Sequence, residues 1–81
     1  MKLQIIHPDK TETVDVDWVE VNTPAGNFVL QKGHVPTILT LSRGREVVYQ
    51  LESGEKKSFV AERGVISVNR NLATLIIGKT K

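Results

Sequence analysis

Val14-Asp15-Val16-Asp17-Trp18 alternates three apolar residues with two acids. Successive side chains of an extended strand point to opposite faces, so this stretch predicts a strand with one face in the core and one in water. At Trp18-Val19 two apolar residues are adjacent, and the alternation then continues to Val21. A shift of one residue turns every later side chain to the other face, and we therefore expect a β-bulge or a sharp twist near Trp18.

The same two-residue period recurs towards both ends of the chain, for example on either side of Glu52-Ser53-Gly54-Glu55, where it predicts a β-hairpin. The turn signals between the apolar stretches are His7-Pro8, Thr23-Pro24-Ala25-Gly26, Gly33, Arg43-Gly44, Gly54, Glu62-Arg63-Gly64 and Asn69-Arg70-Asn71. No window of helix length keeps a 3.6-residue period free of Gly, Pro or β-branched runs. The sequence predicts an all-β fold, a small sandwich or barrel.

The composition is that of one small globular domain, which we place over residues 1-81. The chain has 81 residues, of which 40% are hydrophobic and 25% charged, and this is enough for a single core. The absence of cysteine excludes disulfides and thiolate metal sites. The longest apolar run near the end is Leu75-Ile76-Ile77, and we expect neither a signal peptide nor a membrane span.

Catalytic and metal-binding patterns are absent from the sequence. The only two histidines, His7 and His34, lie in separate turns, and no spacing places two imidazoles on one element. Asp15 and Asp17 share one face of a predicted strand, which alternation alone explains as a solvated outer face. We therefore expect a protein that is not an enzyme and that has no metal or cofactor.

Nucleic-acid binding is the alternative function that the charge leaves open. The net charge is +2, with eleven Lys and Arg scattered among nine acids. The four aromatic residues fall in apolar stretches of predicted strands, where core packing is the default: Trp18, Phe28, Tyr49 and Phe59. A freestanding β-domain that binds nucleic acid through scattered lysines would lose affinity steeply as salt rises, and we expect no such binding.

One corner of the chain is more tightly specified than the rest. It reads Gly26-Asn27-Phe28-Val29-Leu30-Gln31-Lys32-Gly33-His34-Val35-Pro36, an apolar strand that ends in Gly-His-x-Pro. Glycine and proline restrict the backbone there and hold the imidazole in one direction. Taken alone, a histidine in such a corner more often bonds neighbouring backbone than acts as a base.

The order of these segments resembles a known family. Leu3 to Asp9 come first, a long strand follows and ends at Thr23-Pro24, and the Gly26 to Pro36 segment keeps Gly26, Phe28, Gly33, His34 and Pro36 at the family's spacing. Further matches lie downstream: Ile38, Leu39, Leu41, Gly44, the segment from Phe59 to Val68 and the segment from Asn71 to Ile76. In this pattern the chain resembles the epsilon subunit of F-type ATP synthases, over nearly its whole length.

The chain departs from the family pattern at a few positions. Arg63 stands where the family usually has the first of two glycines, Asn27 replaces a common acid, and Gln31-Lys32 replace the usual Leu/Tyr-Pro. The chain ends at Lys81, so we expect a form without the family's carboxy-terminal helical hairpin.

The resemblance implies a flattened β-sandwich of two mostly antiparallel sheets with about 8 to 10 short strands. It implies a non-catalytic subunit of the central stalk that clamps the gamma subunit to the ring of c subunits and so couples ion flow to ATP synthesis. It also implies a peripheral subunit at the cytoplasmic face of the inner (plasma) membrane or its organellar equivalent. The residues expected to face the ring are Asn27, Gln31, Lys32, Gly33 and His34. The residues expected to face gamma are His7, Asp9 and Lys10.

Overall fold

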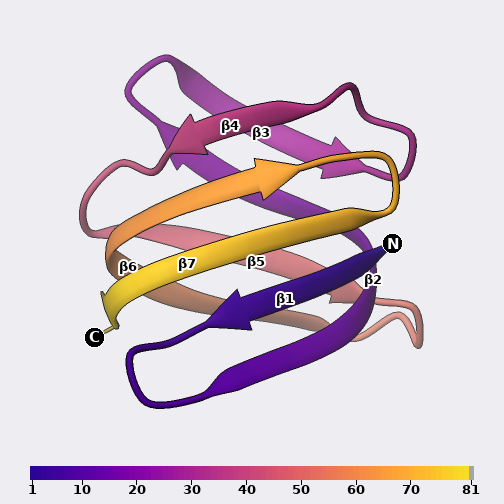
Figure 1. The fold of residues 1–81 in the computed structure, drawn as a ribbon, viewed down its shortest axis with the longest axis horizontal. Coiled ribbons are helices and arrows are strands. Elements are labelled where there is room, and N and C mark those ends of the chain that lie inside the picture. The colour runs from indigo at the N-terminus through magenta and orange to yellow at the C-terminus, as the bar shows by residue number, and fades with distance from the viewer. Residues whose placement is uncertain (81) are drawn as a thin grey trace.

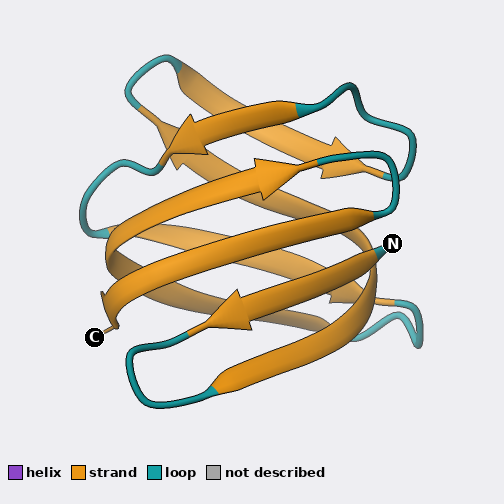
Figure 2. Cartoon of the chain, in the orientation of Figure 1, coloured by secondary structure: helices purple, strands orange, loops and turns teal. Residues whose placement is uncertain are grey.

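The computed structural model describes residues 1–80, and the side chains of residues 1–78. These residues form strands joined by turns, with no helix, which confirms the predicted all-β class (Figure 2). The strands are β1 (Lys2–Ile6), β2 (Thr11–Thr23), β3 (Gly26–Gln31), β4 (Thr37–Thr40), β5 (Arg45–Leu51), β6 (Lys56–Val68) and β7 (Leu72–Thr80). The predicted hairpin on either side of the Gly54 turn is the β5–β6 pair.

The strands form a flattened, closed sandwich. They follow the order β1-β7-β6-β5-β2-β3, β4 pairs with β6, and β1 also pairs with β2, which closes the sheet on itself. One layer contains β4, β6, β7 and β1, and the layer behind it contains β3, β2 and β5 (Figure 1). Every pair is antiparallel except β1–β7. The shortest extent is 18 Å against 26 Å in the other two directions, as the predicted flattened shape requires.

Two strands of thirteen residues each, β2 and β6, pass from one layer into the other. In β2 the register steps from Val16 opposite Leu51 to Trp18 opposite Gln50, so Asp17 is an extra residue, and the predicted bulge near Trp18 is confirmed. The described residues form seven strands rather than 8 to 10 because each of these long strands serves both layers.

The prediction of a turn at Glu62-Arg63-Gly64 is wrong. These residues lie inside β6, where the register against β7 shifts twice, at Glu62 on β6 and at Gly78 on β7. Paired bulges bend the strand sharply without ending it, and the polar, glycine-containing sequence at such a bend is the same as that of a turn.

The core lies between the two layers and is aliphatic. Its buried residues are Leu3, Ile5, Val16, Val19, Val21, Leu30, Leu41, Val47, Tyr49, Ala61, Ile66, Val68, Ala73, Leu75 and Ile77. Of the aromatic residues predicted to pack there, Tyr49 is buried and meets Phe59 edge to face, with ring centroids 6.4 Å apart. Asp15 and Asp17 are exposed, as the alternation predicted.

Candidate functional site

The corner after β3 is held by backbone hydrogen bonds. Gly33 has a φ of 84°, in the left-handed region that favours glycine, and its N–H donates to the carbonyl of Arg70 over 2.9 Å. The N–H of His34 donates to the carbonyl of Gln31 over 3.1 Å. The imidazole Nδ1 lies 2.9 Å from the carbonyl oxygen of Val35. The corner is therefore tied to the β6–β7 turn, and the histidine bonds neighbouring backbone as predicted.

A shallow hollow of about 250 Å³ lies beside this corner. Its lining residues are Val29, Gln31, Lys32, Gly33 and His34. None of them is an acid that could orient or activate the imidazole for proton transfer. The hollow offers a lysine, an amide and a ring nitrogen for polar contacts.

The structure brings together four of the five residues expected to face the ring and separates the fifth. Asn27 is at the start of β3, about 13 Å along the strand from Gln31 at 3.3 Å per residue. Its amide donates to Glu20 over 2.9 Å and to Asn22 over 3.3 Å, both on β2. The five residues therefore occupy two ends of the sandwich, with only Asn27 at the end that holds the β2–β3 turn.

The three residues expected to face gamma share the β1–β2 turn. The N–H of His7 donates to the carbonyl of Lys10 over 2.8 Å and closes this turn. Glu12 lies 3.3 Å from the ammonium of Lys10 and 3.7 Å from Nε2 of His7. Asp9 and Lys10 are exposed, whereas His7 is half-buried. The turn thus presents a mixed-charge tip at the same end as Asn27.

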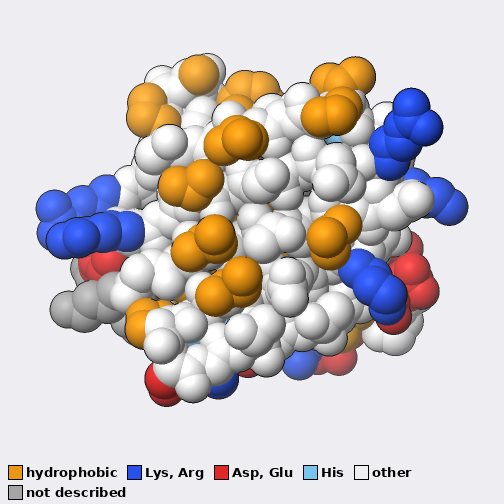
Figure 3. Space-filling model, viewed as in Figure 1, with side chains coloured by type: hydrophobic (Ala, Val, Ile, Leu, Met, Phe, Trp, Pro, Cys, Tyr) orange, Lys and Arg blue, Asp and Glu red, His pale blue; other side chains and the backbone are white. Residues whose placement is uncertain are grey.

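Sequence reasoning missed an apolar surface on the outside of the layer formed by β4, β6, β7 and β1. We call it the apolar face and define it by Ile6, Ile38, Val65 and Ile76. Val65 is directly opposite Ile76 on β7, and Ile76 is opposite Ile6 on β1. Ile38 is 74% exposed, Ile76 53% and Val65 40%. Separate groups of apolar side chains are visible on the front of the molecule (Figure 3).

The rest of the outward positions on this layer are uncharged across its middle. They include Thr40, Ser67, Thr74 and Gln4. The signal that could have revealed the face is the unbroken run at residues 75–77, because a strand covered on both sides needs apolar residues at every position. An exposed apolar sheet surface is a candidate interaction site.

The outer surface of the opposite layer is charged. Glu20, Glu46 and Lys56 point outward from it. Trp18, which the sequence predicted to pack in the core, lies on this outer surface, beyond the extra residue at Asp17. The ammonium of Lys56 is 5.6 Å from the centroid of its ring, a cation–π contact. The two broad surfaces of the sandwich therefore differ in kind.

A second hollow of about 250 Å³ lies behind the β1–β2 turn, and His7, Glu12 and Tyr49 are among its lining residues. Burial, and secondarily the charge of Glu12, raise the pKa of the Tyr49 hydroxyl. Among the described residues, no three His, Asp or Glu side chains lie close enough together to hold a metal ion. The same residues contain no helix long and apolar enough to cross a membrane.

Comparison with solved structures shows the same fold in two mitochondrial ATP synthases. A chain of the Euglena gracilis assembly of OSCP, F1 and c-ring superposes with a TM-score of 0.84 at 21% identity, over 98% of this chain and 51% of that one. A chain of the Tetrahymena thermophila central stalk and c-ring superposes with a TM-score of 0.84 at 15% identity, over 100% of this chain and 65% of that one. This chain thus spans about half to two thirds of the length of those chains.

A comparison with curated protein sequences found no match. A comparison with sequence models of protein families agrees with the resemblance noted in the sequence. The sequence model of the family described as ATP synthase, Delta/Epsilon chain, beta-sandwich domain matches residues 1–79. The chain therefore belongs to the Delta/Epsilon chain family of ATP synthases, of which it contains the β-sandwich domain.

Proposed function

We propose that this chain is a non-catalytic rotor subunit that clamps the gamma subunit to the ring of c subunits, so that ion flow is coupled to ATP synthesis. Membership of the Delta/Epsilon family supports this function. One structure of the same fold comes from an assembly described as OSCP, F1 and c-ring, and the other from one described as central stalk and c-ring. The subunit would lie at the membrane only through this complex, on the cytoplasmic side or its organellar equivalent.

The apolar face is the observation that carries the proposal. Burying an exposed isoleucine contributes about 1.5–3 kcal/mol, so a partner laid over Ile38 and Ile76 gains a substantial part of a stable interface. The β1–β2 turn continues from Ile6 at the edge of this face. A gamma subunit that covers the face would therefore also meet His7, Asp9 and Lys10, as the sequence predicted.

The contact with the ring is placed at an end of the sandwich. The corner residues Gln31, Lys32, Gly33 and His34 form one exposed group with polar atoms for the loops of the ring. Asn27 marks the opposite end. Cross-linking from Lys32→Cys and Asn27→Cys, each with c subunits and with gamma, identifies which end of the sandwich meets the ring. We expect Lys32→Cys to reach a c subunit, and cross-linking of Asn27→Cys alone would contradict this placement.

Charge placed on the apolar face tests the gamma contact. Ile76→Glu should weaken binding to purified gamma by at least about tenfold, because a carboxylate would be desolvated in the interface. Val29→Glu is the matched control, since Val29 is also an exposed strand residue, at 45%, but points out from the opposite layer. Equal affinity of both variants and the parent chain, measured by calorimetry, would contradict the assignment of this face to gamma.

The corner histidine provides a second test. His34→Ala should weaken docking to the ring and lower coupling, because it removes the oriented ring nitrogen. The isolated fold should remain intact, since the backbone bonds of the corner do not involve the side chain. Unchanged coupling in this variant would show that the corner is only a bend.

A further inference from the structure

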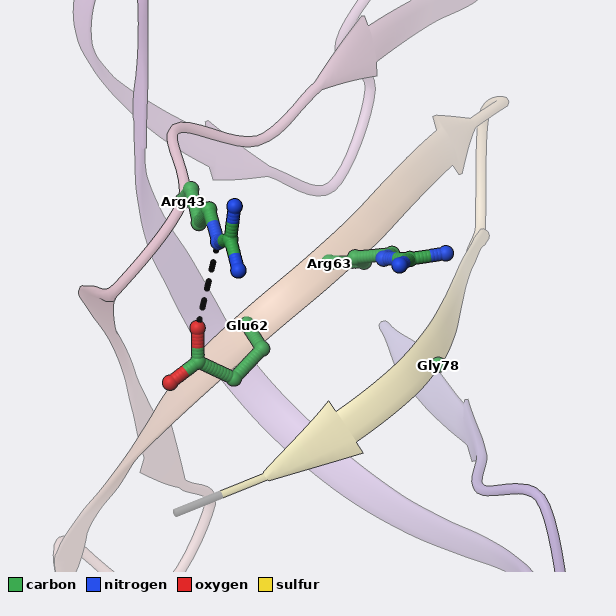
Figure 4. A pocket seen from close by; sticks show the side chains of 4 residues that line it. All are labelled: Arg43, Glu62, Arg63 and Gly78. Carbon is green, nitrogen blue, oxygen red and sulfur yellow. Dashed lines mark hydrogen bonds and ion pairs between the residues drawn. The ribbon is translucent and has the colours of Figure 1, made fainter.

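A third hollow lies far from the corner after β3. It has a volume of about 460 Å³ and is lined by Arg43, Glu62, Arg63 and Gly78 (Figure 4). Arg43 belongs to the turn between β4 and β5, and the other three residues lie on β6 and β7. Basic side chains gather at the end of the molecule where β7 runs to the C-terminus (Figure 3).

The hollow is built on the two bulges between β6 and β7. The register steps from Arg63 opposite Lys79 to Gly64 opposite Ile77, so Gly78 is extra on β7, and Glu62 is extra on β6. In a regular strand the neighbours Glu62 and Arg63 would point to opposite faces. The bulges re-aim these side chains so that both line the same hollow.

Two arginines and one acid are the charged residues that line this hollow in the described part of the chain. Nε of Arg43 lies 3.4 Å from a carboxylate oxygen of Glu62, a long contact that uses one of the five N–H donors of that guanidinium. Arg43 is 82% exposed, so its remaining donors face solvent. Arg63 makes no ion pair or hydrogen bond within the described part of the chain and extends away from Glu62 towards β7, near Gly78 (Figure 4). Among the described residues, two guanidinium groups and one carboxylate therefore line the hollow, and the guanidinium of Arg43 contacts that carboxylate.

We propose that this hollow binds a small phosphate-bearing anion between the guanidinium groups of Arg43 and Arg63. Guanidinium forks match the oxygens of a phosphate group and have no acceptor atoms to repel it. The volume exceeds what a single phosphate group fills and admits a phosphate ester or a diphosphate.

Pyrophosphate is the probe that tests the site. Titration of the ¹⁵N-labelled chain at constant ionic strength should shift the amide resonances of residues 43–44, 61–64 and 77–78, with a dissociation constant of about 1 mM, as expected for an exposed site with two cationic contacts. Arg63→Gln should weaken this binding about tenfold. Arg70→Gln is the matched control, because it removes one arginine from the β6–β7 turn and leaves the hollow unchanged.

The outcomes that overturn the proposal are distinct from those that bear on the rotor function. An absence of shifts at residues 43–44 and 61–64 in about 10 mM pyrophosphate, or an equal loss of affinity in Arg70→Gln, would mean that the hollow is not a site. Citrate at the same ionic strength separates phosphate from carboxylate, and equal affinity for citrate would refute the phosphate assignment. Should Arg63→Gln unfold, Arg63→Lys keeps the charge, loses the planar fork, and should still bind several-fold more weakly.

Discussion

At the scale of single residues, Gly33 shows how one backbone angle shapes the corner. Its φ of 84° is accessible to glycine, and a Cβ added there would meet nothing within 4 Å. Gly33→Ala should therefore cost about 1–2 kcal/mol of unfolding free energy through backbone strain alone. Urea unfolding followed by the fluorescence of the single tryptophan measures this change.

Gly78→Ala is the control for that substitution. The added Cβ would lie 3.6 Å and 3.8 Å from carbons of Arg63, which are ordinary contacts, and no positive φ is involved. Its effect should stay within about 0.5 kcal/mol. Equal stability of Gly33→Ala and the parent chain would show that the corner relaxes to a backbone that any residue adopts.

Tyr49 is the residue whose titration links burial to pH. Its pKa is raised above 10.0 by burial first and by the charge of Glu12 second. The unfolded chain then loses the phenolic proton at lower pH than the folded chain does. The contribution of the protonated Tyr49 hydroxyl to the free energy of unfolding is therefore fully present below pH 10.0 and is lost as the pH rises through the folded pKa. Tyr49→Phe should flatten that part of the stability profile.

The measurement is urea unfolding at several pH values above 9 for the parent and for Tyr49→Phe. The chain has one tyrosine, so tyrosinate absorbance reports this residue alone. Identical stability profiles of the two proteins, or ionisation of Tyr49 at the pKa of a free tyrosine, would show that the hydroxyl is solvated.

At the scale of elements, the bend of β6 depends on the absence of a side chain at Gly64. A Cβ there would lie 2.8 Å from Cδ1 of Leu41 and 3.3 Å from a methyl carbon of Ile77. Both neighbours belong to the core, and the leucine would have to change position. Gly64→Ala should therefore destabilise the chain by about 1–3 kcal/mol, measured by urea unfolding, as overpacking does. Leu41→Ala in the same chain should relieve the clash, and additive losses in the double variant would contradict this cause.

The sequence predicted most of these elements because alternation and turn chemistry are local properties. The bulge near Trp18 and the β5–β6 hairpin follow from neighbouring residues alone. The continuity of β6 through Glu62 and Gly64 could not be predicted, because a bulge and a turn use the same residue types and differ only in long-range pairing with β7. The separation of Asn27 from His34 follows from the length of β3, which is continuous from Gly26 to Gln31.

At the scale of the whole molecule, the sandwich has two unlike surfaces. The alternation of each strand shows which side chains are outward but not which strands become neighbours. Ile6, Val65 and Ile76 are far apart in the sequence and form the apolar face only through the pairing of β1, β6 and β7. One apolar surface and one exposed polar corner are the two features on which we base the proposed adaptor role.

The most direct test of this adaptor role is the number of ions pumped per ATP hydrolysed by the ATP synthase of the source organism in vesicles, with and without this chain. We predict that the depleted complex hydrolyses ATP with little pumping, that the parent chain restores the ratio, and that Ile76→Glu does not restore it. An equal ratio in the depleted and the complete complex would contradict the proposal that this chain couples the rotor to the ring.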